Sequence, residues 1–270
     1  MRNYKHPLSN AEQVNYIEEN KNVVYSQYSK EKAIQYLYEH SYINVITPFK
    51  HRFAEKDKKT GIPLRDGLGN HIYTHKVDFK EYKTCYEKER FEYPAIYSNI
   101  MKFETIFNSI VAYECILYYQ IDTYEQFKKF ITSLRNNLNS LAINKEYNQA
   151  VISHMSDQID DFLVDMGKYD DIYIFMDRLS LNGIITIFRT IDKKIRSKIF
   201  QYLNQSGNVF GYNTFDTFDQ FLSRIVIIRN YVCHFNSLEV LIMYSDIPTK
   251  TLRDSSDRKK WNKTIRRLVS

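Results

Sequence analysis

Hydrophobic residues recur every three or four positions over most of the chain from Phe79 onward, which is the spacing of one face of an α-helix. The longest stripe consists of Ile96, Ile100, Phe103, Phe107, Ile110 and Val111 and predicts a central helix. The predicted helices are Phe79–Tyr93, Pro94–Tyr119, Gln120–Leu141, Glu146–Met166 and Ile184–Leu203, with a last one opening at Thr214 or Asp216. Between them, Ile172–Leu181 is apolar and aromatic and is expected to end at Gly183, and Gly207–Asn213 is expected to be a loop.

The first 78 residues follow a different pattern. Capping residues precede two amphipathic segments, which predicts a hairpin of two helices over Ala11–Asn22 and Lys30–His40. The β-favouring run Tyr42–Thr47 is expected to be extended, and the chain from there to Val77 is rich in turn residues. This part is therefore predicted to be partly helical and partly extended.

Composition agrees with a helical protein. In 270 residues, 43% are hydrophobic, which is enough for a core, and only 7 Gly and 5 Pro interrupt helix formation. The three cysteines, Cys85, Cys115 and Cys233, have neither disulfide nor zinc-site spacing, as is typical of a reducing compartment. No signal peptide and no run of about 18 apolar residues is found. We therefore expect a soluble cytoplasmic protein without a membrane partner.

Positive charge is concentrated at the C-terminal end. Between Lys250 and Ser270, eight basic residues accompany two acidic ones, so this segment carries the whole formal net charge of +6. Such a segment is suited to phosphate binding. The candidate RNA-binding residues are Arg258, Lys259, Lys260, Trp261, Lys263, Arg266 and Arg267. Trp261 either stacks on a base or forms, with Ile265 and Leu268, an apolar stripe that docks a helix on the body of the protein; the two interpretations are compatible.

The stretch Arg229-Asn230-Tyr231-Val232-Cys233-His234 follows the apolar run Ile225–Ile228 and is expected to continue its helix. Asn230 and His234 share a helical face, where the amide is placed to hold one imidazole nitrogen. Arg229 lies about 140° around the helix from His234, so a second copy of the helix is one way to bring both types of side chain to one substrate. His titrates near neutral pH and Arg is a permanent cation that fits phosphate, a combination suited to RNA cleavage by 2′-hydroxyl attack.

Two other histidine patterns carry less chemistry. Arg65 and His71 form a similar pair, but the Gly-rich stretch between them would not hold a helix. His71 and His75 are four residues apart, yet no neighbouring carboxylate or cysteine pattern completes a set of metal ligands. We expect neither a metal nor a cofactor.

Blocks along most of the chain resemble known families. The element R-N-x-x-x-H after an apolar helix resembles the ribonuclease signature of HEPN domains. Its neighbours resemble the abortive-infection Abi family, the AbiD/AbiF-like proteins of bacterial phage defence. The blocks concerned are Lys5-His6-Pro7-Leu8 with Glu12-Gln13, Ala33–Leu37, Tyr42–Phe49, Phe103-Glu104, and Met176–Ser180 through Gly183. Each block alone is unspecific, but their order and spacing are specific.

The chain departs from the family pattern at four positions. Cys233 stands in an Ala place, Ser237 in the place of a second Arg and Val240 in the place of a last Asn. Asn108 stands where an Arg often follows the Phe103-Glu104 pair. The Arg, Asn and His of the motif are retained. The chain therefore keeps the complete motif but lacks two cationic residues of the family pattern.

The resemblance implies a mainly α fold, a HEPN-like helical bundle with an N-terminal helical hairpin and a short, partly extended segment. The expected division is an extension over residues 1–78, a HEPN-like domain over 79–249 and a basic tail or helix over 250–270. It implies that His234 is the general acid and base, that Arg229 binds the scissile phosphate and that Asn230 orients them. Glu104 is either a surface residue that caps a helix or forms a salt bridge or, as the resemblance implies, a supporting residue that faces and positions the Arg229 helix.

The function that this implies is that of an abortive-infection toxin, a metal-independent endoribonuclease acting as a homodimer. RNA is the expected substrate, and a partner that restrains the toxin is expected, with a structured noncoding RNA as a candidate antitoxin. The alternative is a non-catalytic RNA-binding protein that holds a regulatory RNA through its basic tail. A protein-interaction module would leave the charge of the tail unexplained.

Overall fold

A computed structural model describes residues 8–144, 147, 149–168, 172–205, 212, 214–246 and 251–269. Thirteen helices and four strands of two or three residues occur in this part of the chain, so the predicted mainly α fold is confirmed. The first residues of the opening block, Lys5-His6-Pro7, and most of the loop predicted over 207–213 lie outside the described residues. The described chain is thus mainly helical, with short strand pairs and a non-helical stretch over residues 54–76.

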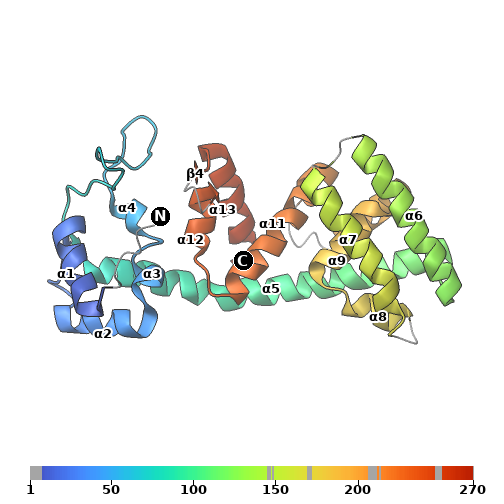
Figure 1. Cartoon of the computed structure of the whole chain (residues 1–270), viewed down its shortest axis with the longest axis horizontal. Coiled ribbons are helices and arrows are strands. Elements are labelled where there is room, and N and C mark those ends of the chain that lie inside the picture. Colours follow the sequence, from blue (N-terminus) through green and yellow to red (C-terminus); the bar gives the residue numbers. More distant parts are fainter. Residues whose placement is uncertain are drawn as a thin grey trace, which may run out of the picture. The chain divides into compact units, whose positions relative to one another are not determined.

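The chain forms two compact units. The first contains Met1–Ile96 and Asn230–Lys263, and the second contains Tyr97–Arg229 and Thr264–Ser270. Three helices pass from one unit to the other: α5 (Phe79–Tyr119), α11 (Phe215–Cys233) and α13 (Ser255–Val269). The units therefore do not coincide with the three consecutive segments expected from the sequence, because each unit is assembled from separate parts of the chain. Figure 1 shows the elements by label.

The first unit begins with the predicted helical hairpin, α1 (Asn10–Lys21) and α2 (Lys30–His40). Ser9 and Glu12 form a capping box at the start of α1, and Ser29 caps α2. The two helices lie side by side (Figure 1). Their buried faces contribute to a core whose members include Val14, Ile17, Leu37, Val45, Ile46, Phe79 and Tyr82. The prediction of this hairpin is confirmed, with boundaries within one residue.

The segment predicted to be extended is mostly not extended. The run Tyr42–Thr47 instead forms the short helix α3 (Tyr42–Val45) and a turn, and α4 (Lys50–Phe53) follows. Val45 and Ile46 are completely buried, so packing overrides the β propensity of this run. Strands β1 (Val23–Val24) and β2 (Val77–Asp78) form a short parallel ladder.

Helix α5 runs without interruption through Pro94, where the sequence predicted a boundary between two helices. A proline in a helix interior removes one backbone hydrogen bond and introduces steric strain, which is why a boundary was the natural prediction. Here the flanking residues Tyr93 and Ile96 are buried, and their packing holds the helix together across the proline. This continuity places residues 89–93 and 103–108 on one structural element.

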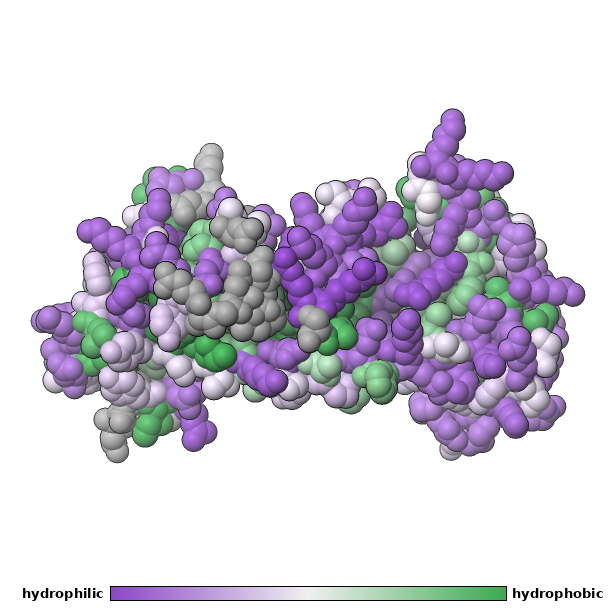
Figure 2. Space-filling view, turned by 180° about the vertical axis from the view of Figure 1, so that it is seen from behind, coloured by the Kyte–Doolittle hydropathy of each residue, from purple (hydrophilic) through white to green (hydrophobic). Residues whose placement is uncertain are grey.

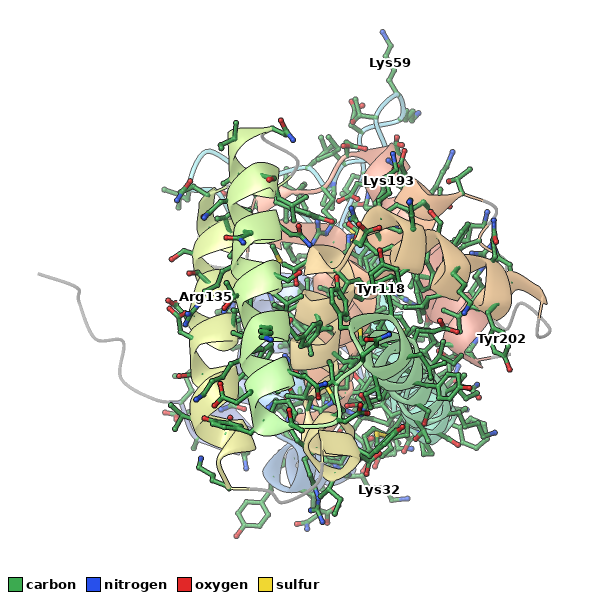
Figure 3. The ribbon with its side chains drawn as sticks, turned by 90° about the vertical axis from the view of Figure 1, so that its right-hand side faces the viewer. Lys32, Lys59, Tyr118, Arg135, Lys193 and Tyr202 are labelled. Carbon is green, nitrogen blue, oxygen red and sulfur yellow. The ribbon has the colours of Figure 1, made fainter. Side chains whose placement is uncertain are left out.

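The second unit packs α6 (Tyr124–Ile143) and α7 (Gln149–Met166) side by side (Figure 1). Arg135 on α6 forms an ion pair with Asp160 on α7 at 2.6 Å, and Figure 3 shows Arg135 at the outer edge of this pair. Both helices contact α9 (Leu181–Thr190), whose described side chains are nearly all buried. The remaining helices of this unit are α8 (Ile172–Arg178) and α10 (Lys193–Gln205).

Gly183 lies inside α9 rather than ending the preceding segment, which corrects the prediction. The hydroxyl of Ser180 accepts a hydrogen bond from the Gly183 amide and so caps the start of α9. The preceding segment ends instead at Arg178, the last residue of α8 (Ile172–Arg178). The predicted helix Ile184–Leu203 is divided after Thr190, where Ile191 is extended. Gly is unfavourable inside a helix, but the Ser180 cap starts α9 even though Gly183 lies in its first turn.

The first unit ends with α12 (Leu238–Met243), the antiparallel strands β3 (Tyr244–Asp246) and β4 (Thr251–Leu252), and the first part of α13. Hydrophilic residues cover most of the face shown in Figure 2, and hydrophobic residues there form separate small areas. The predicted start of the motif helix is confirmed, because Thr214 accepts a hydrogen bond from the Thr217 amide just before α11.

Candidate functional site

The R-N-x-x-x-H motif lies at the C-terminal end of α11. The helix is anchored by its buried residues Ile225, Ile228 and Val232. Asn230 and His234 are exposed, and Arg229 is half-buried. The division between the two compact units falls between Arg229 and Asn230. The predicted continuation of the apolar helix into the motif is confirmed.

His234 is the residue that caps the C-terminus of α11. The amide of Phe235 donates to the carbonyl oxygen of Val232 at 3.2 Å. The amide of Asn236 donates to the carbonyl oxygen of Tyr231 at 2.8 Å. These two bonds define a Schellman motif, in which the residue after the cap is left-handed. Phe235 has a φ of 52°, a conformation in which a bulky L side chain is strained and Gly is usual.

Two side chains of α5 hold this strained turn. A guanidinium nitrogen of Arg90 donates to the carbonyl oxygen of Phe235 at 2.5 Å, and the hydroxyl of Tyr93 donates to that of Asn236 at 2.5 Å. The Arg90 guanidinium also lies 4.8 Å from the Tyr93 ring and 5.5 Å from the Phe235 ring. Two side chains of α5 therefore fix the turn that follows His234.

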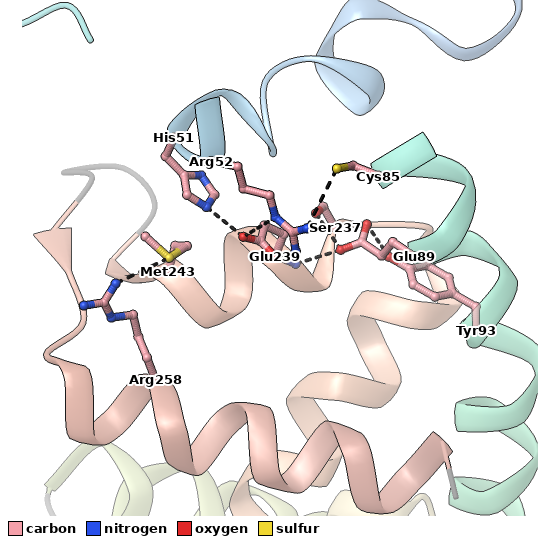
Figure 4. A network of polar contacts seen from close by, with 9 residues as sticks. All are labelled: His51, Arg52, Cys85, Glu89, Tyr93, Ser237, Glu239, Met243 and Arg258. Carbon is pink, nitrogen blue, oxygen red and sulfur yellow. Dashed lines mark hydrogen bonds and ion pairs between the residues drawn. The ribbon is translucent and has the colours of Figure 1, made fainter. Parts of the chain in front are cut away.

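A third α5 residue, Glu89, binds the start of α12. Its carboxylate accepts hydrogen bonds from the Ser237 hydroxyl at 2.9 Å and from the Glu239 amide at 2.7 Å (Figure 4). Burial raises the pKa of Glu89, while these two hydrogen bonds oppose that shift. Ser237 is buried at the N-cap position of α12, and its hydroxyl is bound to Glu89 rather than to the helix backbone. The family place of a second Arg is thus occupied by a structural residue in this chain.

Glu239 in turn connects α12 to α4. Its carboxylate lies 2.7 Å from Nε2 of His51 and accepts a hydrogen bond from Nε of Arg52 at 3.0 Å (Figure 4). Burial alone would raise the pKa of Glu239, but the hydrogen bonds and charges of His51 and Arg52 lower it to about 2. The carboxylate is therefore ionised and firmly held at neutral pH.

The residues that support the motif were missed by the sequence analysis. Glu89, Arg90 and Tyr93 lie 143 to 150 residues from their partners after α11, and His51 lies 188 residues from Glu239. Their spacing along α5 is that of an ordinary helix turn. No local pattern in the sequence distinguishes them, so only the folded chain identifies them.

The motif side chains themselves are not engaged. Arg229, Asn230 and His234 form no side-chain hydrogen bond or ion pair with any residue that the structure describes, and Nε of Arg229 is buried without a partner. The predicted bond between the Asn230 amide and the His234 imidazole is thus absent within the described chain. A half-buried cation, an amide and an imidazole are left available at the end of one helix.

Glu104 does not contact Arg229 in the described part of the chain, and its Oε2 atom is buried without a hydrogen-bond partner. The rings of Phe103 and Phe221 are 5.3 Å apart and those of Phe107 and Phe218 are 6.1 Å apart, so α5 and α11 run antiparallel here. This register places Glu104 about nine residues, or roughly 13 Å, from Arg229 along the helix axis. The structure therefore does not bring these two residues together.

The basic segment forms α13, and its charges lie on one side of the helix. Lys259, Lys260, Lys263 and Arg266 are exposed. The opposite side is buried and carries Trp261, Thr264, Ile265 and Leu268. Because the predicted apolar stripe is buried, α13 is an amphipathic helix with an exposed basic face.

Trp261 corrects one expectation for this segment. Its side chain is only 5% exposed, and the Arg253 guanidinium covers its ring at 4.8 Å. Trp261 is thus a packing residue, and its face is not available for stacking on a base. Arg258, half-buried against the Met243 sulfur, and Arg267, which lies 4.7 Å from the Tyr212 ring, are less available than the exposed lysines.

The other histidine patterns show no further chemistry. Arg65 and His71 face each other in an isolated antiparallel bridge, not on a helix. Burial lowers the pKa of His71 to about 4, and the side chain of His75 is 85% exposed. The described residues contain no group of three or more His, Cys, Asp or Glu side chains that could hold a metal ion. None of the helices in the described ranges has the length and hydrophobicity needed to cross a membrane.

Comparison with known proteins gives one match. A family model described as Abi-like protein matches residues 35–238. This range includes α5, α11 and the whole R-N-x-x-x-H motif. No curated protein matches the chain. No solved structure matches it either.

Proposed function

The chain belongs to the Abi-like family of abortive-infection phage-defence proteins, and from this premise we propose that it is a metal-independent endoribonuclease of the HEPN type that acts as a toxin in that defence. The observation that carries the proposal is the state of the motif. Its three side chains have no partner among the described residues, while the turn beside them is held by Arg90 and Tyr93. A rigid support with free polar side chains is what catalysis requires.

His234 moves the protons in the proposed reaction. As a base it takes the proton of an RNA 2′-hydroxyl, whose oxygen attacks the adjacent phosphorus. As an acid it protonates the leaving 5′-oxygen, so that the products end in a 2′,3′-cyclic phosphate and a 5′-hydroxyl. The imidazole is exposed at the helix terminus and so reaches a backbone in solution. Asn230, one turn before it on α11, orients the imidazole and the phosphate when RNA is bound.

Arg229 stabilises the negative charge that develops on the phosphorane. Its guanidinium is not neutralised by any carboxylate in the described chain. It projects from α11 about 140° away from His234, so one helix presents the two groups in different directions. We therefore infer a homodimer in which two copies of the motif supply Arg and His to one phosphate. This pairing removes the need for a metal as the source of positive charge.

The basic face of α13 supplies RNA binding in this proposal. Lys259, Lys263 and Arg266 are exposed and follow the i, i+4, i+7 spacing of one helix face. A row of unpaired cations binds a phosphate backbone irrespective of sequence and releases counterions. The same face suits a structured noncoding RNA that restrains the toxin.

A second function is favoured by that same observation. The basic face of α13 does not depend on the motif, so the chain would still bind RNA if His234 were inert. In that case the protein holds a regulatory RNA without cleaving it. Growth and RNA integrity distinguish the two functions.

The test is induction of wild-type protein and the His234→Ala variant at equal expression in bacterial cells. The proposal predicts that wild type alone arrests growth and produces RNA fragments that end in 2′,3′-cyclic phosphate. Cys233→Ala is the matched control, because Cys233 is exposed on the neighbouring position and is expected to leave activity intact. Identical growth and intact RNA for wild type and His234→Ala would refute the catalytic role.

A further inference from the structure

A groove of about 660 Å³ lies between α5 and α8 in the second unit. This volume is within the range of small-molecule sites, which is roughly 300–1,000 Å³. Its lining includes Asn108 and Tyr113 from α5, and Tyr173, Asp177 and Arg178 from α8. None of them belongs to the R-N-x-x-x-H motif. The groove is therefore separate from the motif, although Arg229 belongs to the same unit.

At the base of the groove Asn108 has an unused hydrogen-bond acceptor. Its side chain is only 6% exposed, and its amide nitrogen donates to the backbone carbonyl of Asp177 at 3.3 Å. This bond fixes the orientation of the amide, and the other atom, Oδ1, is buried without a partner. A buried acceptor without a donor is unfavourable, so a ligand that supplies an N–H or O–H group is favoured here.

The rim of the groove carries two side chains of opposite charge. The carboxylate of Asp177 and the guanidinium of Arg178 are exposed and form no ion pair within the described ranges of the chain. As neighbours on a helix they project about 100° apart, so they suit different ends of one ligand. One end of that ligand must donate hydrogen bonds, and the other must be anionic.

Aromatic side chains from both helices line the same groove. Tyr113 of α5 is 55% exposed and Tyr173 of α8 is 52% exposed, so both side chains are accessible from solvent. Tyrosine rings on two walls provide stacking surfaces for a planar group. The ligand therefore combines a planar ring system with a donor edge and a negative charge.

We propose that this groove binds a guanine nucleotide, with the base between Tyr113 and Tyr173, its N1–H and 2-amino groups donating to Asp177, and its phosphate paired with Arg178. Guanine is the nucleobase whose Watson–Crick edge offers two adjacent donors, which match the two oxygens of one carboxylate. A ribose hydroxyl supplies the donor that Oδ1 of Asn108 lacks. Free nucleotides and guanosines within an RNA share this chemistry.

The test uses the full-length His234→Ala protein, so that binding is measured without cleavage and independently of the proposed ribonuclease. Fluorescence anisotropy of ribose-labelled GMP is followed, with competition by unlabelled GMP, AMP, CMP and UMP. We expect saturable binding in which GMP competes at least tenfold better than the others. A guanine-containing trinucleotide that competes at least tenfold better than GMP would assign the site to RNA and would still support the proposal.

Three variants make the test specific. Asp177→Asn should reduce the preference for GMP over AMP at least tenfold, and Arg178→Gln should weaken GMP but not guanosine. Tyr173→Ala should abolish binding. Tyr202→Ala is the matched control, because Tyr202 is exposed on α10, outside the groove, and is labelled in Figure 3. All variants should keep the thermal unfolding midpoint of the parent.

Three outcomes would overturn the proposal. They are no saturable binding at millimolar nucleotide, equal competition by all four nucleotides, and equal loss in the Tyr173→Ala and Tyr202→Ala proteins. Self-association that Tyr173→Ala disrupts, in a protein that binds no nucleotide, would assign the groove to a second copy of the chain. Because every measurement is made on a cleavage-deficient protein, none of these results depends on whether the chain is a ribonuclease.

Discussion

Arg90 donates a hydrogen bond to the carbonyl oxygen of Phe235 at 2.5 Å. Phe235 directly follows His234 and lies 145 residues after Arg90 in the sequence. The bond fixes a residue whose φ of 52° is unfavourable for phenylalanine. It therefore stabilises the one turn on which the position of the imidazole depends. The candidate site owes its geometry to α5 as much as to the motif.

Removing this support should reduce catalysis more than stability. We expect Arg90→Met to lower RNA cleavage at least tenfold, about 1.4 kcal/mol in the activation barrier, because His234 loses its fixed position. Arg90→Lys, which keeps a cation and a donor, should recover part of the activity. Arg135→Met, which removes an exposed arginine of α6, is the control and should leave cleavage unchanged. Equal activity of the Arg90→Met protein and wild type would contradict a positioning role.

A variant with Ala is usually more stable than the variant with Gly at the same position. The left-handed conformation of Phe235 predicts the opposite order of stability there. Both Phe235→Ala and Phe235→Gly lose the ring, but Gly accepts a φ of 52° without strain, so the Gly protein should be more stable by about 1 kcal/mol. At the exposed helical position Asp161 the order should be normal, with Gly less stable than Ala by about 1 kcal/mol. Denaturant unfolding of the four proteins measures this. A Phe235→Ala protein as stable as Phe235→Gly would rule out the strain.

Glu239 predicts a specific dependence of stability on pH. The pKa of its carboxyl is lowered from 4.5 to about 2 in the folded protein. Its stabilising contribution is thus complete above about pH 4.5 and is lost as the pH falls toward 2. A shift of this size corresponds to roughly 3 kcal/mol. The stability difference between wild type and Glu239→Gln should therefore shrink between pH 6 and pH 3. A constant difference over this range would show that the ion pairs with His51 and Arg52 contribute little.

The basic face of α13 predicts salt-dependent RNA binding. Changing Lys259, Lys263 and Arg266 to Ala should weaken binding of single-stranded RNA and reduce the slope of log K against log salt by roughly two to three. A variant with Lys32, Lys59 and Lys193 changed to Ala carries the same change in net charge at separate places labelled in Figure 3. It should bind with nearly the wild-type slope. Equal slopes for the two triple variants would remove α13 from the RNA-binding surface.

The sequence was informative where local patterns decide the structure. The helical hairpin, the continuation of α11 into Asn230 and the amphipathic α13 follow from capping residues and hydrophobic spacing, and all three are present. Tyr42–Val45 and Pro94 were predicted differently because tertiary burial outweighs β propensity and the cost of an interior proline there.

No local pattern in the sequence predicts the residues that support the site. Glu89 and Arg90 act through contacts more than 140 residues away, and Ser237, which departs from the family pattern, donates a hydrogen bond to Glu89 in this chain. Burial likewise removed Trp261 from the RNA-binding candidates, since the same residue spacing fits a packed stripe and an exposed one. Such roles depend on which elements meet, which spacing alone does not determine.

The most direct test of the central claim is cleavage of total RNA by purified protein in the presence of EDTA, with the end groups of the products determined. We expect wild type to cut, to leave 2′,3′-cyclic phosphate and 5′-hydroxyl ends, and to be unaffected by the chelator. The His234→Ala protein, with an unchanged unfolding midpoint, should leave the RNA intact. Cleavage by the His234→Ala protein at the wild-type rate, or cleavage by wild type that stops with EDTA, would contradict the account.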